Sequence, residues 1–294
     1  MKRNYLIVFF LGVIINCFSA DFETTYENAR RLLNENKNSE ALILLKQAEL
    51  IAPENKKMHI YIDIAICYRR LKNYDRAIEY YLMAAKLSPK MVDIWYNIGL
   101  ANYYKGNLKE AIANYNKAIE LNPDYTEAYG ALAMAYRDMG LIDIAIKTIN
   151  KSLAIDEKYA GGYNILGNCY EDKGWHYKAI DMYKKAVVFK PDYASAFYNL
   201  GIVYDEIGQY NKAIDSYKQA LQFSNKDADI YFNLGVTYMK AGQFNKAQEI
   251  FKETIKMDNS NRKAYENLIE ALKESGQAGE ADKWEKIKEN KFGK

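Results

Sequence analysis

The apolar residues of the stretch 93–123 recur at helical spacing, with one interruption. Trp95 lies three residues before Ile98 and four before Gly99, so a helix would place all three on one face. Gly106 and the asparagine after it then break the pattern, as residues of a tight turn do. The first half of the stretch therefore predicts a short amphipathic helix followed by a turn.

The second half of the same stretch predicts a second helix. Ala111, Tyr115 and Ala118 follow one another at spacings of four and three, which again defines a single face. Pro123 ends this helix because proline has no N–H to donate and its ring clashes with the preceding turn. A hairpin of two such helices has more apolar surface than it can cover by itself, so it needs neighbours.

The chain supplies these neighbours as copies of the hairpin at a period of 34 residues. The alanine that opens the second helix recurs at this period, after a first interval of 36, at Ala41, Ala77, Ala111, Ala145, Ala179, Ala213, Ala247 and Ala281. The small residue of the first helix recurs as Ala29, Ala65, Gly99, Ala133, Gly167, Gly201 and Gly235. The aromatic residue of the second helix recurs as Tyr81, Tyr115, Tyr183, Tyr217 and Phe251.

The period predicts eight hairpins. Their bounds are 22–55, 58–91, 92–125, 126–159, 160–193, 194–227, 228–261 and 262–294. In the last hairpin, Glu285 and Lys288 stand where other repeats carry an aromatic residue and an alanine. A polar outer face of this kind is what the open end of a solenoid requires, so we expect the last hairpin to act as a C-terminal cap.

Each recurring residue type has a physical reason. Small residues such as Gly99 and Ala111 let two helices approach closely, and we expect the aromatics to fill gaps between successive hairpins. Glycine ends the first helix in most repeats, where a left-handed backbone conformation is cheapest for glycine. All prolines of the chain, Pro53, Pro89, Pro123 and Pro191, fall between a second helix and the next first helix.

The order W/Y-x-x-L-G, Y, A-x-x-x-F/Y-x-x-A, P at a period of 34 resembles the tetratricopeptide repeat (TPR), over residues 22–294. The resemblance implies an all-α fold, a right-handed α-solenoid of about eight helix-turn-helix hairpins. It also implies a protein-protein interaction scaffold or assembly factor that binds a partner polypeptide in its concave groove, with no catalysis and no cofactor. The alternative function is an envelope transport or biogenesis accessory that binds lipid or glycan.

In the TPR family the groove is lined by fixed positions of the first helix. Carried over to this sequence, they give the candidate peptide-binding residues Ile62, Ile66, Arg69, Tyr96, Leu100, Tyr103, Met134, Arg137, Asn168, Glu171, Tyr198, Ile202, Asp205, Phe232, Val236 and Met239. The basic residues precede the acidic ones along the chain. A structural alternative is that the apolar members only pack between repeats and that the charges are a solvated face.

Residues 1–20 read as an export signal rather than as part of the fold. Lys2 and Arg3 precede an apolar run of eleven residues at 5–15, which is short for a membrane span. The stretch 14–17, Ile-Ile-Asn-Cys, resembles a bacterial lipobox, with Asn16 where a small residue is usual, and this implies lipidation of Cys17. Cleavage after Ser19 or Ala20 and an uncleaved anchor are the alternatives. We therefore expect an exported bacterial protein, periplasmic or anchored in the cell-envelope membrane, that contacts the membrane only through its N-terminus.

Net charge and the spacing of the cysteines and histidines argue against several classes of function. The net charge is +3, and without Lys2 and Arg3, the only charged residues among the first twenty, it is +1. No basic stripe of the kind that binds nucleic acid is evident. Cys67 and Cys169 lie three repeats apart, too far for a disulfide, and are expected to be small buried thiols. The two histidines lie at no metal-ligand spacing, so we predict no catalytic, cofactor or metal site.

Overall fold

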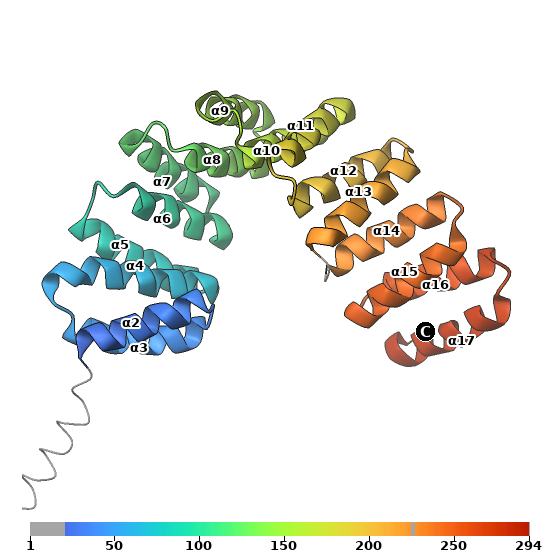
Figure 1. Cartoon of the computed structure of the whole chain (residues 1–294), viewed down its shortest axis with the longest axis horizontal. Helices are drawn as coiled ribbons and strands as arrows, with labels where there is room; N and C mark the ends of the chain where they lie inside the picture. The colour runs from blue at the N-terminus through green and yellow to red at the C-terminus, as the bar shows by residue number, and fades with distance from the viewer. Residues whose placement is uncertain (1–20, 225–226, 294) are drawn as a thin grey trace, which may run out of the picture. The chain divides into compact units, whose positions relative to one another are not determined.

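The structure is a computed structural model that describes residues 21–224 and 227–293, and the predicted export signal with Cys17 lies outside this part. Every regular element within the described residues is an α-helix, sixteen in all. The helices follow one another as short antiparallel pairs joined by tight turns (Figure 1). The all-α solenoid class predicted from the repeats is confirmed.

Contacts divide the chain into two units, of which the first ends at Met139 and the second begins at Gly140. The helices of unit 1 are α2 (Phe22–Asn34), α3 (Asn38–Ile51), α4 (Glu54–Arg70), α5 (Tyr74–Leu87), α6 (Val92–Lys105), α7 (Leu108–Leu121) and α8 (Thr126–Asp138). The helices of unit 2 are α9 (Ile142–Ile155), α10 (Ala160–Asp172), α11 (His176–Phe189), α12 (Ala194–Glu206), α13 (Tyr210–Phe223), α14 (Ala228–Lys240), α15 (Phe244–Met257), α16 (Arg262–Glu274) and α17 (Ala278–Phe292).

Within each unit every helix packs against the next one along the chain. First helices of neighbouring hairpins also touch, as α6 does with α8, and α10 with α12. In unit 2, buried residues of α11 to α17 form one continuous apolar cluster. Each hairpin is therefore stabilised by its neighbours rather than by a core of its own, as expected of a repeat protein.

The small residue of the first helix packs against the aromatic residue of the second helix in the same hairpin. A Cβ atom at Gly99 would lie 2.6 Å from Cδ1 of Tyr115, and one at Gly201 would lie 2.5 Å from Cε1 of Tyr217. The ring of Tyr115 also lies in one apolar cluster with Leu132 and Ala135 of the next hairpin, where it was expected from the sequence. The ring fills the space that the glycine leaves open, because the two residues lie sixteen positions apart on facing sides of one hairpin.

The turn between the two helices uses a left-handed residue. Gly106 has φ 90° and stands as the C-cap of α6, and the glycines at the equivalent positions of later hairpins also have positive φ. Asn36 and Lys72 adopt the same conformation in the first two hairpins, with φ 58° and 61°. The turn thus keeps its geometry where glycine is missing, at a modest cost in backbone strain.

The longer first interval of the repeat is absorbed by one helix. α4 begins at Glu54, directly after Pro53, and runs for 17 residues. It therefore starts four residues before the predicted bound at 58. Proline suits this place because it stands just outside the first helical turn, where a backbone N–H is not needed for the helix.

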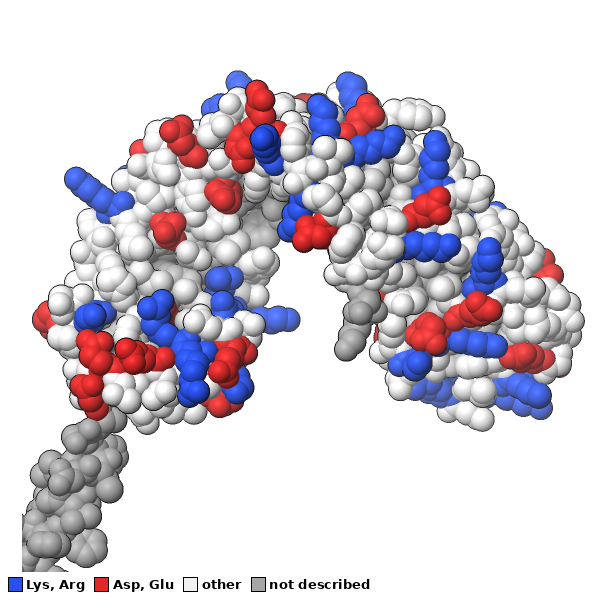
Figure 2. All heavy atoms as spheres, viewed as in Figure 1, with Lys and Arg blue, Asp and Glu red and all other residues white. Residues whose placement is uncertain are grey.

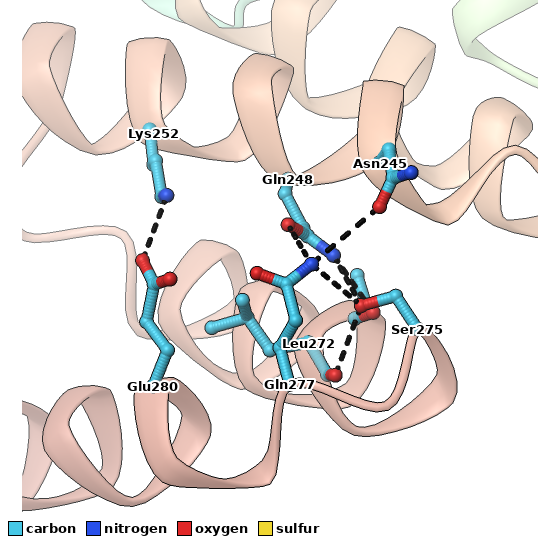
Figure 3. A network of polar contacts seen from close by, with 8 residues as sticks. Asn245, Gln248, Lys252, Leu272, Ser275, Gln277 and Glu280 are labelled. Carbon is cyan, nitrogen blue, oxygen red and sulfur yellow. Dashed lines mark hydrogen bonds and ion pairs between the residues drawn. The ribbon is translucent and has the colours of Figure 1, made fainter.

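A polar network joins the last two hairpins (Figure 3). Gln248 is buried, and its Nε2 donates to the carbonyl oxygen of Ala271 and to Oγ of Ser275, at 3.1 and 2.6 Å. Gln277 in turn donates from Nε2 to Oε1 of Gln248 at 3.2 Å. Most equivalent positions carry isoleucine, namely Ile78, Ile112, Ile146, Ile180 and Ile214. A buried glutamine is tolerated here because its donor and acceptor groups have partners.

Three further features of the described residues concern thiol reactivity, metal binding and membrane spans. Cys67 and Cys169 are both buried thiols that form no disulfide, and burial raises the pKa of the Cys67 thiol to about 11, which keeps it protonated and unreactive at neutral pH. No group of three or more acidic, histidine or cysteine side chains suited to a metal ion is found in residues 21–224 and 227–293. None of the described helices has the length and apolarity needed to cross a bilayer.

Candidate binding face

The sixteen predicted groove residues all lie on first helices. In unit 1 they form the unit 1 face, which consists of Ile62, Ile66 and Arg69 on α4, Tyr96, Leu100 and Tyr103 on α6, and Met134 and Arg137 on α8. In unit 2 they form the unit 2 face, which consists of Asn168 and Glu171 on α10, Tyr198, Ile202 and Asp205 on α12, and Phe232, Val236 and Met239 on α14. Met134 is 39% exposed, and all the others are half-buried.

Helical spacing explains why these residues share a face. Tyr96, Leu100 and Tyr103 lie four and three residues apart on α6, one turn after another. The core residues of the same helix, such as Ile94 and Ile98, occupy the intervening positions and are buried. The candidate residues thus border the core on one side and solvent on the other.

Tyr96 of the unit 1 face and Tyr198 and Phe232 of the unit 2 face rest on the core aromatics of their own hairpins. The ring centroids of Tyr96 and Tyr115 lie 5.9 Å apart, and those of Tyr198 and Tyr217 also lie 5.9 Å apart. Tyr96 makes a second contact with Tyr125 at 5.2 Å. Burial raises the pKa of Tyr96 above its ordinary value, so its hydroxyl stays neutral at physiological pH. Part of each of these side chains packs against a core ring, and part is exposed to solvent.

In unit 2 a ladder of side-chain hydrogen bonds connects successive first helices. Asn199 on α12 donates from Nδ2 to the side-chain oxygens of Asn164 and Asn168 on α10, each at 3.0 Å. Asn233 on α14 donates to the hydroxyl of Tyr198 on α12 at 2.8 Å. The polar edge of the unit 2 face is therefore held in place before any ligand arrives.

The acidic residues of the unit 2 face already have partners. Asp205 accepts a hydrogen bond from Thr237 at 2.9 Å and pairs with Lys240. The hydroxyl of Tyr183 donates towards Glu171, with an oxygen-oxygen distance of 2.6 Å. These carboxylates are thus engaged within the fold.

Sequence reasoning missed the role of Thr237 and the pairing of Lys240. Their signal is present in the sequence, because the residues joined by the ladder lie close to one period apart: Thr237 follows Asp205 by 32 residues, and Lys240 follows it by 35. Polar side chains that recur at nearly one period on first helices are neighbours in the folded chain. In unit 1 the same rule joins Tyr103 to Asp138, 35 residues later.

Basic and acidic side chains are mixed on the visible surface of the protein. On the face drawn in Figure 2, Lys and Arg side chains are interspersed with Asp and Glu, and no large patch of one sign forms. Several exposed charges of the described residues form ion pairs, such as Arg76 with Glu79 at 2.7 Å. Pairs of this kind contribute little to stability.

Comparison with known protein families finds several profiles of the same repeat. Profiles described as tetratricopeptide repeat match residues 59–91, 92–125, 114–147 and 228–261. One described as TPR repeat matches 176–208 and 205–242. No curated protein sequence matches the chain.

Solved structures share the fold at low sequence identity. A tetratricopeptide repeat protein from Parabacteroides merdae is 18% identical, with a TM-score of 0.66 over 85% of this chain and 98% of that one. The Cut9-Hcn1 hetero-tetramer of the APC/C gives 20% identity and a TM-score of 0.65 over 87% of this chain, which spans only 56% of that one. Pseudomonas aeruginosa pilF is 19% identical, with a TM-score of 0.60 over 68% of this chain and 91% of that one. At these identities the likeness shows the fold alone.

Proposed function

Because the chain belongs to the tetratricopeptide repeat family, whose members bind other proteins or peptides, we propose that it is a scaffold or assembly factor that binds a partner polypeptide on its first-helix faces. The repeats of this family are generally non-catalytic, and we propose no reaction for this chain. The proposal concerns the unit 1 face and the unit 2 face separately, and each is tested by itself.

The observation that carries the proposal is a half-buried aromatic residue at the same repeat position within each unit, Tyr96 in unit 1 and Tyr198 and Phe232 in unit 2. Each rests on a core aromatic, at 5.9 to 6.0 Å between ring centroids. A ring held in this way loses little conformational freedom on binding, and large aromatic anchors dominate protein interfaces. Side chains that served packing alone could be fully buried, as Tyr115 and Phe251 are.

The binding face is tested by truncating these anchors. Tyr96→Ala, Tyr198→Ala and Phe232→Ala, singly and combined, are compared with wild type for capture of a crosslinked partner from envelope extract. Each truncation is expected to weaken binding by about 2 kcal/mol, which corresponds to a factor of about thirty in the dissociation constant. Circular dichroism and thermal melting show that each variant is folded at the assay temperature.

The control for this test is charge reversal at exposed positions of the second helices, Glu79, Lys117 and Lys184. These variants are expected to bind as wild type does. Wild-type capture by the combined aromatic variant, with loss in the charge variants, would refute the first-helix faces as the binding site. A small lipid or glycan retained in native mass spectra, without a polypeptide, would favour the alternative function.

We further propose that the protein is exported and held in a bacterial envelope through a lipid on Cys17. The support is the basic start, the apolar run and the lipobox-like stretch of residues 1–17. The wild-type protein is expected to incorporate labelled palmitate and to partition into detergent, and Cys17→Ala is expected to lose both properties. An intact mass that begins at Ala20 or Asp21 would instead indicate ordinary cleavage and a soluble exported protein.

A further inference from the structure

The second helices of the first two hairpins carry apolar side chains that are exposed to solvent. Ile43 and Leu50 on α3 are 61% and 85% exposed, and Leu82 on α5 is 42% exposed. Met83 follows Leu82 and is half-buried, and both line one pocket together with Trp95. We call Ile43, Leu50, Leu82 and Met83 the second-helix patch.

The two helices that carry the patch lie next to each other. Nζ of Lys46 on α3 donates to the hydroxyl of Tyr80 on α5 and lies 5.0 Å from the centroid of its ring. Lys46 also pairs with Glu49, and Arg76 on α5 pairs with Glu79 at 2.7 Å. Because these charges are paired within the fold, the surface around the patch has little net charge, and its distinguishing property is apolar area.

The repeat does not require apolar side chains at these positions. The patch residues stand two, five, six or nine residues after the recurring alanine, and in the other six second helices the same positions hold a large apolar residue only at Val188 and Ile287. At the position of Leu50, α7 carries Glu120 and α15 carries Lys256. Packing between hairpins therefore does not explain Leu50, and clustered exposed apolar residues of this kind mark a contact surface.

The other helix of the first hairpin is polar where it is exposed. The charged residues of α2 that face solvent are Glu23, Glu27, Arg30 and Arg31. The exposed large apolar residues of this hairpin are instead on α3, namely Ile43, Leu50 and Ile51. An apolar surface would therefore contact the hairpin through α3 rather than through α2.

The chain enters the first hairpin at the end where Leu50 lies. α2 begins at Phe22 and α3 ends at Ile51, and the two helices are antiparallel (Figure 1), so these two ends of the helices share one end of the hairpin. Phe22 follows Cys17 by only five residues, and five residues span at most ~18 Å when fully extended. A lipid on Cys17 would thus hold the first hairpin within about two helix diameters of the bilayer.

We propose that the second-helix patch rests on the surface of the lipid bilayer to which the chain is anchored. The inference rests on the proposed lipid at Cys17 and adds to it a contact made by the folded hairpins. Aliphatic side chains that enter the boundary between headgroups and acyl chains leave water, which is favourable in proportion to the area buried. A weak contact suffices, because a short tether keeps the patch at a high effective concentration beside the membrane.

The test couples the proposed mature chain, which begins at Cys17, to phosphatidylcholine vesicles through a maleimide lipid. Cys67 and Cys169 are buried, so Cys17 is the thiol that reacts. In a Leu50→Trp variant, acyl-chain bromine atoms in the lipid are expected to quench the added tryptophan. Thr24→Trp is the matched control, because Thr24 is exposed on the polar helix of the same hairpin and close to the same tether. It should show no quenching beyond that of the coupled wild type.

Acidic substitutions test whether the apolar side chains hold the contact. In the Leu50→Trp background, Ile43→Glu combined with Leu82→Glu should lower the ratio of docked to undocked protein about tenfold or more. Gln219→Glu combined with Gln222→Glu adds the same charge at exposed positions of α13 and should leave the ratio unchanged. Quenching should persist at high salt, because screening does not weaken an apolar contact. Circular dichroism of the uncoupled variants shows that they are folded.

Several results would overturn the contact with lipid. These are equal quenching in Leu50→Trp and Thr24→Trp, absence of quenching in both, and quenching that survives Ile43→Glu with Leu82→Glu. A dimer of the uncoupled chain in sedimentation velocity that Leu50→Glu dissociates would assign the patch to a second copy instead.

The coupling experiment is independent of the two functions proposed above. The tether is made chemically, so quenching does not depend on whether the cell attaches a lipid to Cys17. Failure of palmitate labelling would overturn the lipid anchor, and with it the placement of the patch on a membrane in the cell. Lack of quenching together with successful labelling would overturn the patch contact alone. Capture of a polypeptide by the first-helix faces is measured separately from both.

Discussion

Replacement of Tyr217 by alanine is expected to destabilise unit 2 by about 3–5 kcal/mol, in the range of large-to-small changes in protein cores. Tyr217 is 2% exposed, and its ring occupies the space beside Gly201. Its centroid lies 5.9 Å from that of Tyr198, so the truncation also removes support from the unit 2 face. Neither neighbour can fill the space without moving a helix.

The loss of stability in Tyr217→Ala should appear first in the hairpins around the substitution and only later in the rest of unit 2. Because hairpins in a solenoid contact only their neighbours, hydrogen exchange should accelerate first in α12 and α13 and in the helices next to them. Tyr177→Ala is the matched control, because Tyr177 is 71% exposed and its truncation should change stability by less than about 0.5 kcal/mol. Uniform loss of protection in a single step across all hairpins would contradict the one-dimensional organisation.

Substitution of Gly201 by alanine is the second large effect that we expect. The added Cβ would lie 2.5, 2.6 and 2.8 Å from three ring atoms of Tyr217. Overpacking of this kind typically costs about 1–3 kcal/mol, whereas replacing a helical glycine by alanine gains about 0.5–1 kcal/mol. The steric term is larger, so Gly201→Ala should lower the midpoint of urea unfolding.

The same substitution at a second helical glycine is expected to have the opposite effect on stability. Gly279 lies in α17, and nothing stands within 4 Å of a Cβ added there, so Gly279→Ala should be neutral or stabilising by up to about 1 kcal/mol. Combining Gly201→Ala with Tyr217→Leu should recover part of the loss relative to Tyr217→Leu alone, because the ring that causes the clash is gone. Equal effects of the two alanine substitutions would show that Gly201 does not stand in close contact with Tyr217.

Local rules were enough to predict the helices and turns. Apolar residues at spacings of three and four define each helix, and a positive φ at the turn explains the glycine at Gly106 and its equivalents. Both signals depend on residues within one or two turns of each other, so no knowledge of distant contacts was needed. The start of α4 at Glu54 escaped this reasoning because a fixed period cannot show which helix absorbs two extra residues.

Contacts between side chains were predicted only in part. The ring of Tyr115 was expected between hairpins, and it lies in one apolar cluster with Leu132 and Ala135 of the next hairpin, but its close fit against Gly99 of its own hairpin was not foreseen. The burial of Gln248 was not foreseen, because it depends on Ser275 and Gln277, which lie 27 and 29 residues further along the chain. Such pairs are visible only when the rotation of one helix against the next is known.

By itself, then, the sequence determined the repeat, the helical class and the residues that border the core, because each follows from periodic spacing and from backbone preferences. Tertiary structure decided which polar groups meet. It placed Asp205 against Lys240 and Thr237. The physical reason is that a hydrogen bond or ion pair requires two groups to come within about 3–4 Å in a suitable direction, and no spacing along the chain specifies that distance.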